Sequence, residues 1–159
     1  MNCSWYDICE VQRDDLMDTK MHDVLMKDVY SHLYKDRYAF KSNELSNAVK
    51  MLEKNLLEMG LAPEDVNGKN VLDMGTGRQA LAFHSFKAGR VYHFDISPVP
   101  VEALTRLRKS KQRFRNIFSE QLDICEPHEL NCDGGLDFVY LVGILQHLHN
   151  PGVAMENIL

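Results

Sequence analysis

The chain has 159 residues, of which 45% are hydrophobic and 26% charged, and its formal net charge is −5. This length is sufficient for one domain with a single hydrophobic core. No run of about 18 apolar residues occurs, which excludes a membrane-spanning helix, and no secretory signal pattern opens the chain, so we expect a cytoplasmic protein.

The negative charge is concentrated in the first 65 residues, which hold 8 Lys and Arg against 13 Asp and Glu. Residues 66–159 hold 10 of each. Because nucleic-acid phosphates require a cationic surface, this balance argues against a nucleic-acid partner. No Cys-x-x-Cys pair occurs, so we expect reduced thiols and no metal site. The cysteines are Cys3, Cys9, Cys125 and Cys132.

Residues 1–65 are predicted to form an N-terminal helical cap or lid. Apolar residues recur at spacings of three and four in two segments, which indicates two amphipathic helices. The apolar face of the first consists of Met21, Val24, Leu25, Val29 and Leu33. The face of the second consists of Leu45, Ala48, Val49, Leu52, Leu56 and Met59. Ser42 or Asn43 is the expected cap of the second helix, and Gly60 its expected end.

The link between these helices is rich in aromatic residues and could close over a ligand. Its candidate contacts with a cofactor or an acceptor are Tyr34, Arg37, Tyr38 and Phe40. The alternative interpretation is that these side chains only pack between the two helices.

Residues 66–159 are predicted to form a domain in which strands and helices alternate. We expect strands at 70–74, 91–95, 116–124 and 136–143, and helices at 78–89, 97–111 and 150–159. Ser97 and Asn150 are the expected N-caps of the last two helices, since Pro follows each. This alternation predicts an α/β fold, a partial Rossmann-like doubly wound parallel sheet in three α/β/α layers. Such sheets bind ligands beyond the carboxyl ends of their strands.

The first strand ends in the sequence Asp73-Met-Gly75-Thr76-Gly77. Gly75 allows a tight turn, and Gly77 leaves room for a ligand against the main chain. With Ala80 in the last position, the run also fits a dinucleotide-binding fingerprint, although weakly. A glycine turn that serves only chain reversal is the remaining alternative.

Acidic residues follow the next two strands. Asp95 lies 20 residues after Gly75, where a carboxylate can accept hydrogen bonds from both hydroxyls of a ribose. Asp123 could accept a hydrogen bond from an adenine amino group, with Ile124 packed on the ring. Asp73 would repel a pyrophosphate and would suit a ligand that carries an ammonium group. S-adenosylmethionine has that charge and no phosphate.

These residues together resemble the class I S-adenosylmethionine-dependent methyltransferases, over a region from about Asn70 to the C-terminus. The segments VLDMGTGRQ, HFDIS and LDI are similar to the first three motifs of the family, and the segment from Leu136 onward is similar to its fourth-strand region. The resemblance implies a set of cofactor-binding residues: Asp73, Gly75, Thr76, Gly77, Asp95, Ile96, Asp123, Ile124, Leu141 and Val142. By this resemblance Asp73, Gly75 and Gly77 would hold the methionine portion.

The sequence departs from the family pattern at two places. Gln79 stands where many members have a third glycine. The chain also ends at Leu159, before three further strands that the family fold contains. We interpret the chain as a fragment. The alternatives are that a partner supplies the remainder, that the chain forms a homodimer, or that the protein is a degenerate remnant.

Methyl transfer from a sulfonium is an in-line displacement, which needs a base only if the nucleophile must lose a proton. His147 is the candidate for that role, because it follows the fourth strand and histidine titrates near neutral pH. A packing role for His147 remains open, and His149 is interpreted as structural. Six basic residues from Arg106 to Arg115, with Phe114 among them, leave open an RNA-facing patch, although a solvated helix end is the simpler interpretation.

The sequence thus predicts an S-adenosylmethionine-dependent methyltransferase that acts on a small molecule. No Asn-Pro-Pro-Tyr-like segment follows the fourth strand, which by resemblance argues against methylation of DNA bases. The alternatives are an NAD(P)-dependent oxidoreductase and a non-catalytic cofactor-binding or scaffold fragment.

Overall fold

The computed structural model describes residues 24–25, 27–29, 31–32, 42–126 and 132–158. The candidate lid contacts Tyr34, Arg37, Tyr38 and Phe40 lie outside these residues. In the described part of the chain, no helix is long and apolar enough to cross a membrane.

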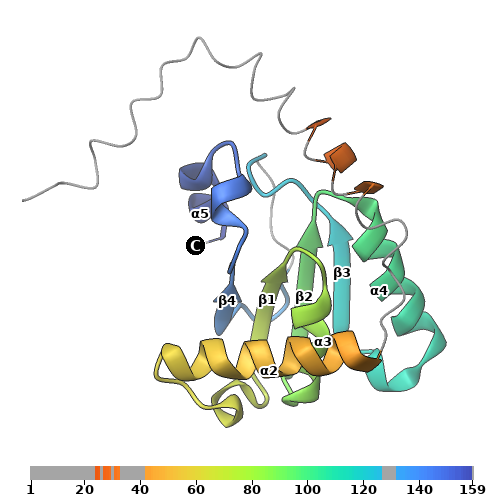
Figure 1. The fold of residues 1–159 in the computed structure, drawn as a ribbon, viewed down its shortest axis with the longest axis vertical. Coiled ribbons are helices and arrows are strands. Elements are labelled where there is room, and N and C mark those ends of the chain that lie inside the picture. The colour runs from red at the N-terminus through yellow and green to blue at the C-terminus, as the bar shows by residue number, and fades with distance from the viewer. Residues whose placement is uncertain (1–23, 26, 30, 33–41, 127–131, 159) are drawn as a thin grey trace, which may run out of the picture.

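Four parallel strands form one sheet in the order β3-β2-β1-β4, as Figure 1 shows. The strands are β1 (Asn70–Met74), β2 (Arg90–Asp95), β3 (Ile117–Gln121) and β4 (Phe138–Tyr140). Strand order reverses beside β1, which pairs with β2 on one edge and with β4 on the other. The predicted α/β fold with a Rossmann-like, doubly wound parallel sheet is therefore confirmed.

Helices cover both faces of the sheet, which completes three α/β/α layers. They are α2 (Ser42–Glu58), α3 (Arg78–Ser85), α4 (Pro98–Ser110) and α5 (Pro151–Ile158). Short 3-10 helices span Pro63–Val66, Gln112–Phe114 and Leu145–His147. One core cluster joins α2, α3 and Leu104 of α4 to the first face, and a second joins Ala154 of α5 to the other.

The predicted N-caps of α4 and α5 are confirmed. The Ser97 hydroxyl accepts a hydrogen bond from the Val99 N–H at 3.3 Å. The Asn150 side-chain oxygen accepts one from the Val153 N–H at 3.1 Å.

The two N-terminal helices are present where the structure describes them. Residues 24, 25, 27–29, 31 and 32 are helical, but Val24 and Leu25 of the predicted apolar face are 61% and 59% exposed. In α2 the predicted face is buried at Ala48, Leu52 and Leu56, whereas Met59, beyond the end of the helix, is 50% exposed. The division of the chain at residue 65 stays a prediction.

The predicted carboxyl-terminal ends of α3, β3 and β4 are wrong. Helix α3 ends at Ser85 rather than at Gly89, because the chain turns at Lys87, whose φ is +63°. Gly89 instead allows its own backbone to lie close to that of Gly68, since a Cβ at Gly89 would lie 2.5 Å from the Gly68 carbonyl oxygen. Strands β3 and β4 end earlier than predicted, so Asp123 and Leu141 lie in the segments that follow the strands.

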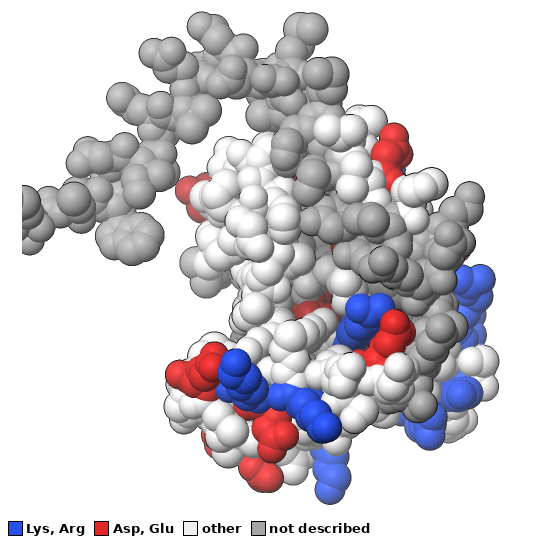
Figure 2. Space-filling view, viewed as in Figure 1, with Lys and Arg blue, Asp and Glu red and all other residues white. Residues whose placement is uncertain are grey.

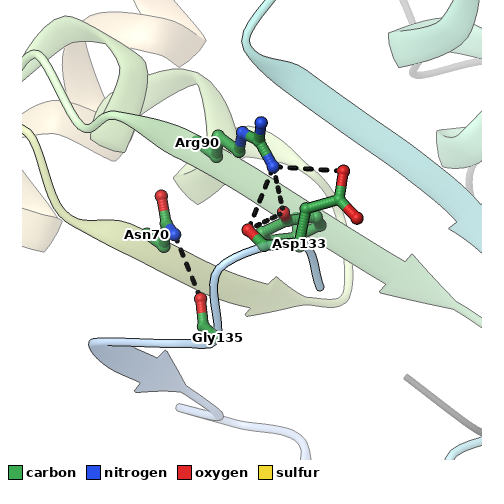
Figure 3. Close-up of polar contacts among 5 residues, drawn as sticks. Asn70, Arg90, Asp133 and Gly135 are labelled. Carbon is green, nitrogen blue, oxygen red and sulfur yellow. Dashed lines mark hydrogen bonds and ion pairs between the residues drawn. The ribbon is translucent and has the colours of Figure 1, made fainter. Parts of the chain in front are cut away.

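The segment before β4 is anchored at the amino ends of β1 and β2 (Figure 3). The guanidinium of Arg90 lies 3.2 Å from the Asp133 carboxylate and also donates to the Asp133 carbonyl oxygen at 3.0 Å. The Asn70 side chain donates to the Gly135 carbonyl oxygen at 3.1 Å. These contacts fix the start of β4 and leave the carboxyl ends of the strands to form the site.

Candidate ligand-binding site

A cavity of about 680 Å³ lies at the carboxyl ends of the strands. Its wall combines the ends of β1, β2 and β3 with the segment after β4 and the first half of α2. The predicted site residues that line it are Gly75, Thr76, Asp95, Ile96, Asp123, Ile124, Val142 and His147. Three other predicted site residues do not line the cavity and lie behind its wall, namely Asp73, Gly77 and Leu141.

The glycine turn after β1 has backbone angles that favour glycine. Gly75 has a φ of +114° and Gly77 a φ of +71°. A Cβ at Gly75 would lie 2.9 Å from Ile144, and one at Gly77 would lie 2.7 Å from Leu104. The turn is therefore closely packed as well as unusually bent.

Asp73 caps α3 from within the sheet. Its side chain is 1% exposed, and one carboxylate oxygen accepts a hydrogen bond from the Ala80 N–H at 2.8 Å. Burial raises the pKa of Asp73 well above its usual range, with a further contribution from Asp95, and the bond from Ala80 opposes that rise. A carboxyl oxygen of the protein itself thus uses a free N–H in the first turn of α3.

Asp95 ends β2 at the cavity wall. One of its oxygens accepts a hydrogen bond from the Ser97 N–H at 2.7 Å. Burial raises the pKa of Asp95 to about 7, although the bond from Ser97 acts in the other direction. A carboxylate with a strongly raised pKa in a cavity is a candidate for ligand binding.

Asp123 lies two residues beyond β3, in a turn held by its own side chain. Its Oδ1 accepts a hydrogen bond from the Cys125 N–H at 3.0 Å. The intervening Ile124 is 1% exposed, and its carbonyl oxygen accepts from the Asn157 side chain of α5 at 2.8 Å. Helix α5 therefore holds in place the turn that brings Asp123 to the cavity.

The sequence did not reveal an ion pair at the cavity wall. Arg78, the first residue of α3, lies 3.1 Å from Glu44 of α2, and both residues line the cavity. The residues are 34 positions apart, so no local pattern signals the contact. Among the described lining residues, Arg78 is the one Lys or Arg, against Glu44, Asp95 and Asp123.

Both histidines of the segment after β4 reach the cavity. His147 ends the 3-10 helix Leu145–His147, and His149 follows it. The sequence interpretation gave His149 a structural role, and its place on the cavity wall makes it a second candidate for ligand contact.

The basic run of residues 106–115 lies away from the cavity lining. Figure 2 shows Lys and Arg side chains on the side of the molecule where α4 lies. Phe114 is 7% exposed, and the Arg113 guanidinium lies 4.7 Å from the centre of its ring. The ring is therefore not presented for stacking with a nucleobase, which weakens the interpretation as an RNA-facing patch.

No protein-family model matches the chain, and no curated protein matches its sequence. A crystal structure of the [4+2]-cyclase SpnF matches this structure with a TM-score of 0.48 at 20% sequence identity. The match covers 58% of this chain and 34% of SpnF, so the chain corresponds to about a third of that protein. A likeness at this level concerns the backbone alone.

Proposed function

We propose that the chain binds S-adenosylmethionine in the cavity and belongs to a methyltransferase that acts on a small molecule. The observation that carries the proposal is the position of the Asp73 carboxyl group at the first turn of α3. In dinucleotide-binding folds this is the place where the pyrophosphate lies. Here the N–H of Ala80 already has a carboxyl oxygen of the protein as its acceptor, so this N–H is not available to a phosphate oxygen.

The charge and size of the cavity support the same ligand. Three carboxylates and one guanidinium are present among the described lining residues, and the guanidinium of Arg78 is paired with Glu44. This surplus of negative charge suits a cation such as a sulfonium with an ammonium group. A volume of about 680 Å³ is within the range of small-molecule sites.

The proposed arrangement follows the strand ends. The turn at Gly75 and Thr76 would contact the methionine portion, Asp95 the ribose, and Asp123 with Ile124 the adenine. The acceptor atom forms a bond to the methyl carbon while the carbon–sulfur bond breaks, and the sulfur leaves as a neutral thioether. The protein's part is to align the two molecules and to exclude water. His147 would take the proton of an acceptor that must lose one.

Calorimetric titration of the chain with S-adenosylhomocysteine, NAD(H) and NADP(H) tests the proposal. We expect micromolar binding of S-adenosylhomocysteine and no binding of the nicotinamide cofactors. Binding of a nicotinamide cofactor alone would favour the oxidoreductase. If none of them binds a chain that is folded by circular dichroism, a longer chain must also fail to bind before the scaffold interpretation is adopted.

The Asp73→Asn variant should weaken the binding of S-adenosylhomocysteine by about 3–10-fold, because a bound ammonium group favours the ionised form of Asp73 and an amide cannot ionise. The amide oxygen of the substituted side chain can still accept from Ala80, so we expect the fold to be retained. Titration of both proteins at pH 8 measures the effect. Weaker binding of NAD(H) in the variant than in the original chain would contradict this assignment of Asp73.

Arg78→Gln tests whether the cavity recognises an amino-acid group. We propose that the Arg78 guanidinium, which has further N–H donors beside the one used by Glu44, also donates to the ligand carboxylate. Loss of this charge-assisted hydrogen bond should weaken the binding of S-adenosylhomocysteine by about tenfold or more. The affinity for 5′-methylthioadenosine, which lacks the amino-acid portion, should change little. Arg106→Gln, at a position on α4 away from the cavity lining, is the matched control and should affect neither ligand. An equal loss for both ligands in Arg78→Gln would show that Arg78 only supports the fold.

A further inference from the structure

His93 is a fully buried polar residue in the interior strand β2, where apolar side chains are the rule. Its Nε2 lies 2.7 Å from the Gly75 carbonyl oxygen, and its Nδ1 lies 2.7 Å from the Ser119 hydroxyl oxygen. His93 does not line the cavity. It therefore lies behind the glycine turn and bonds to it.

These two contacts determine which nitrogen of His93 carries the proton. A carbonyl oxygen can only accept, so Nε2 must be the donor to Gly75. In the neutral ring Nδ1 is then an acceptor, and the Ser119 hydroxyl donates to it. Burial lowers the pKa of His93 to about 4, with the bond to Gly75 opposing, which agrees with a neutral ring at physiological pH.

The register of the sheet explains why these groups meet. Asp73, His93 and Ser119 are adjacent on β1, β2 and β3, so their side chains lie on one face at one level. In each strand this polar residue comes two positions after a buried apolar one. Asp73 is hydrogen-bonded to the backbone of α3, and His93 to the backbone of the glycine turn. These side chains therefore hold both ends of the segment from Gly75 to Ala80.

Gly75 is thereby fixed to β2 at both of its backbone groups. Its N–H donates to the Phe94 carbonyl oxygen at 3.2 Å, and its carbonyl oxygen accepts from His93. Strand β2 ends at Asp95, which lines the cavity together with Gly75. The bond from His93 therefore sets the distance between the glycine turn and the Asp95 carboxylate.

We propose that His93 is a positioning residue of the ligand site: its Nε2–H, with the tautomer selected by Ser119, holds the Gly75 carbonyl and aligns the glycine turn with Asp95. The inference rests on the proposed function, because the two aligned groups are those that would contact the methionine and ribose portions. His93 has no contact with the ligand in this arrangement.

Two amide substitutions separate the roles of the ring nitrogens. The Gln side chain can place its NH₂ where Nε2 lies and can donate to Gly75, whereas the shorter Asn side chain reaches only toward Ser119. We expect His93→Gln to keep the affinity for S-adenosylhomocysteine within about threefold, and His93→Asn to lose about tenfold or more. Equal affinities of the two folded variants, whether both retained or both lost, would overturn the inference.

A measurement on the original chain keeps the test independent of whether the variants fold or the ligand binds. Nitrogen-15 NMR of the imidazole should show His93 as the Nε2–H tautomer at pH 7, without titration down to about pH 5.

Ser119→Ala should broaden or shift the His93 and Thr76 signals while His84 stays unchanged. An Nδ1–H tautomer or a charged ring at pH 7 would overturn the positioning role. Failure of the original chain to bind S-adenosylhomocysteine, with the expected tautomer present, would count against the proposed function alone.

Discussion

In the Asp95→Asn variant we expect two changes of opposite sign, a loss of ligand affinity and a gain in stability. The amide oxygen still accepts from Ser97, but the amide nitrogen can only donate, so the ribose hydroxyls lose an acceptor. This loss should weaken the binding of S-adenosylhomocysteine by about 1–3 kcal/mol, or roughly 5–150-fold. Titration calorimetry measures this loss. An unchanged affinity would contradict the assignment of Asp95 to the ribose.

The gain in stability follows from the raised pKa of Asp95. The folded-state pKa is about 7, against about 4 in the unfolded chain. Between these pH values the folded chain binds more protons than the unfolded chain, so stability falls as the pH rises from about 4 to about 7 and stays lower above it. The amide has no charge to bury, yet its oxygen can still accept from Ser97.

At pH 8 we expect the free energy of unfolding of Asp95→Asn to exceed that of the original chain by about 1–3 kcal/mol. The full pKa difference corresponds to about 4 kcal/mol, and the partial exposure of Asp95 reduces it. Urea unfolding at pH 4 and pH 8 measures the difference, which should disappear at the lower pH. Glu102→Gln, an exposed carboxylate on α4, is the control and should change neither affinity nor stability.

Gly77→Ala should lower the free energy of unfolding by about 2–3 kcal/mol. A left-handed backbone angle costs an alanine about 1 kcal/mol. The added Cβ would also lie 2.7 Å from Leu104 Cδ1 and 3.4 Å from His93 Nε2. Leu104 is 1% exposed, so moving it disturbs a packed core and adds a further cost.

Gly68→Ala is the matched control for this substitution. Gly68 has a φ of +73°, close to the +71° of Gly77, but a Cβ there has no atom within 4 Å. This variant should lose only the backbone contribution of about 1 kcal/mol. Urea unfolding compares the two variants, and equal losses would mean that the packing around the glycine turn contributes nothing.

The sequence predicted the fold well where local signals and burial agree. Strand β1 was placed at its observed bounds because five mostly apolar residues stand between a turn and a glycine pair. The cap of α4 at Ser97 was likewise readable, since Ser before Pro is a local signal. By contrast, apolar residues past the true ends of α3 and β4 extended the predicted elements, because their burial depends on neighbours that local sequence does not reveal.

The sequence predicted that the candidate site lies at the carboxyl ends of the strands, but it did not predict the side-chain contacts found there. Asp95 and Asp123 line the cavity as expected, but Asp73 faces α3 from behind the wall. The ion pair between Glu44 and Arg78 depends on how α2 packs across the sheet, and no spacing of residues in the sequence indicates that packing. The sequence did contain one indication of the role of His93, because a histidine follows a strand valine by two residues, as Asp73 does in the preceding strand. Only the register of the sheet shows that His93 and Asp73 lie side by side.

The order of the strands has a consequence for synthesis on the ribosome. Of the four strands β1 is the first to emerge, β2 then pairs with one edge of β1, and β3 pairs with the outer edge of β2. Its other edge waits for β4, which begins at Phe138, long after β1 begins at Asn70. During that interval an apolar strand of the nascent chain offers unpaired backbone groups, which is a hazard for association between chains. A chaperone bound near the ribosome exit would be most useful to this protein between the appearance of β1 and that of β4.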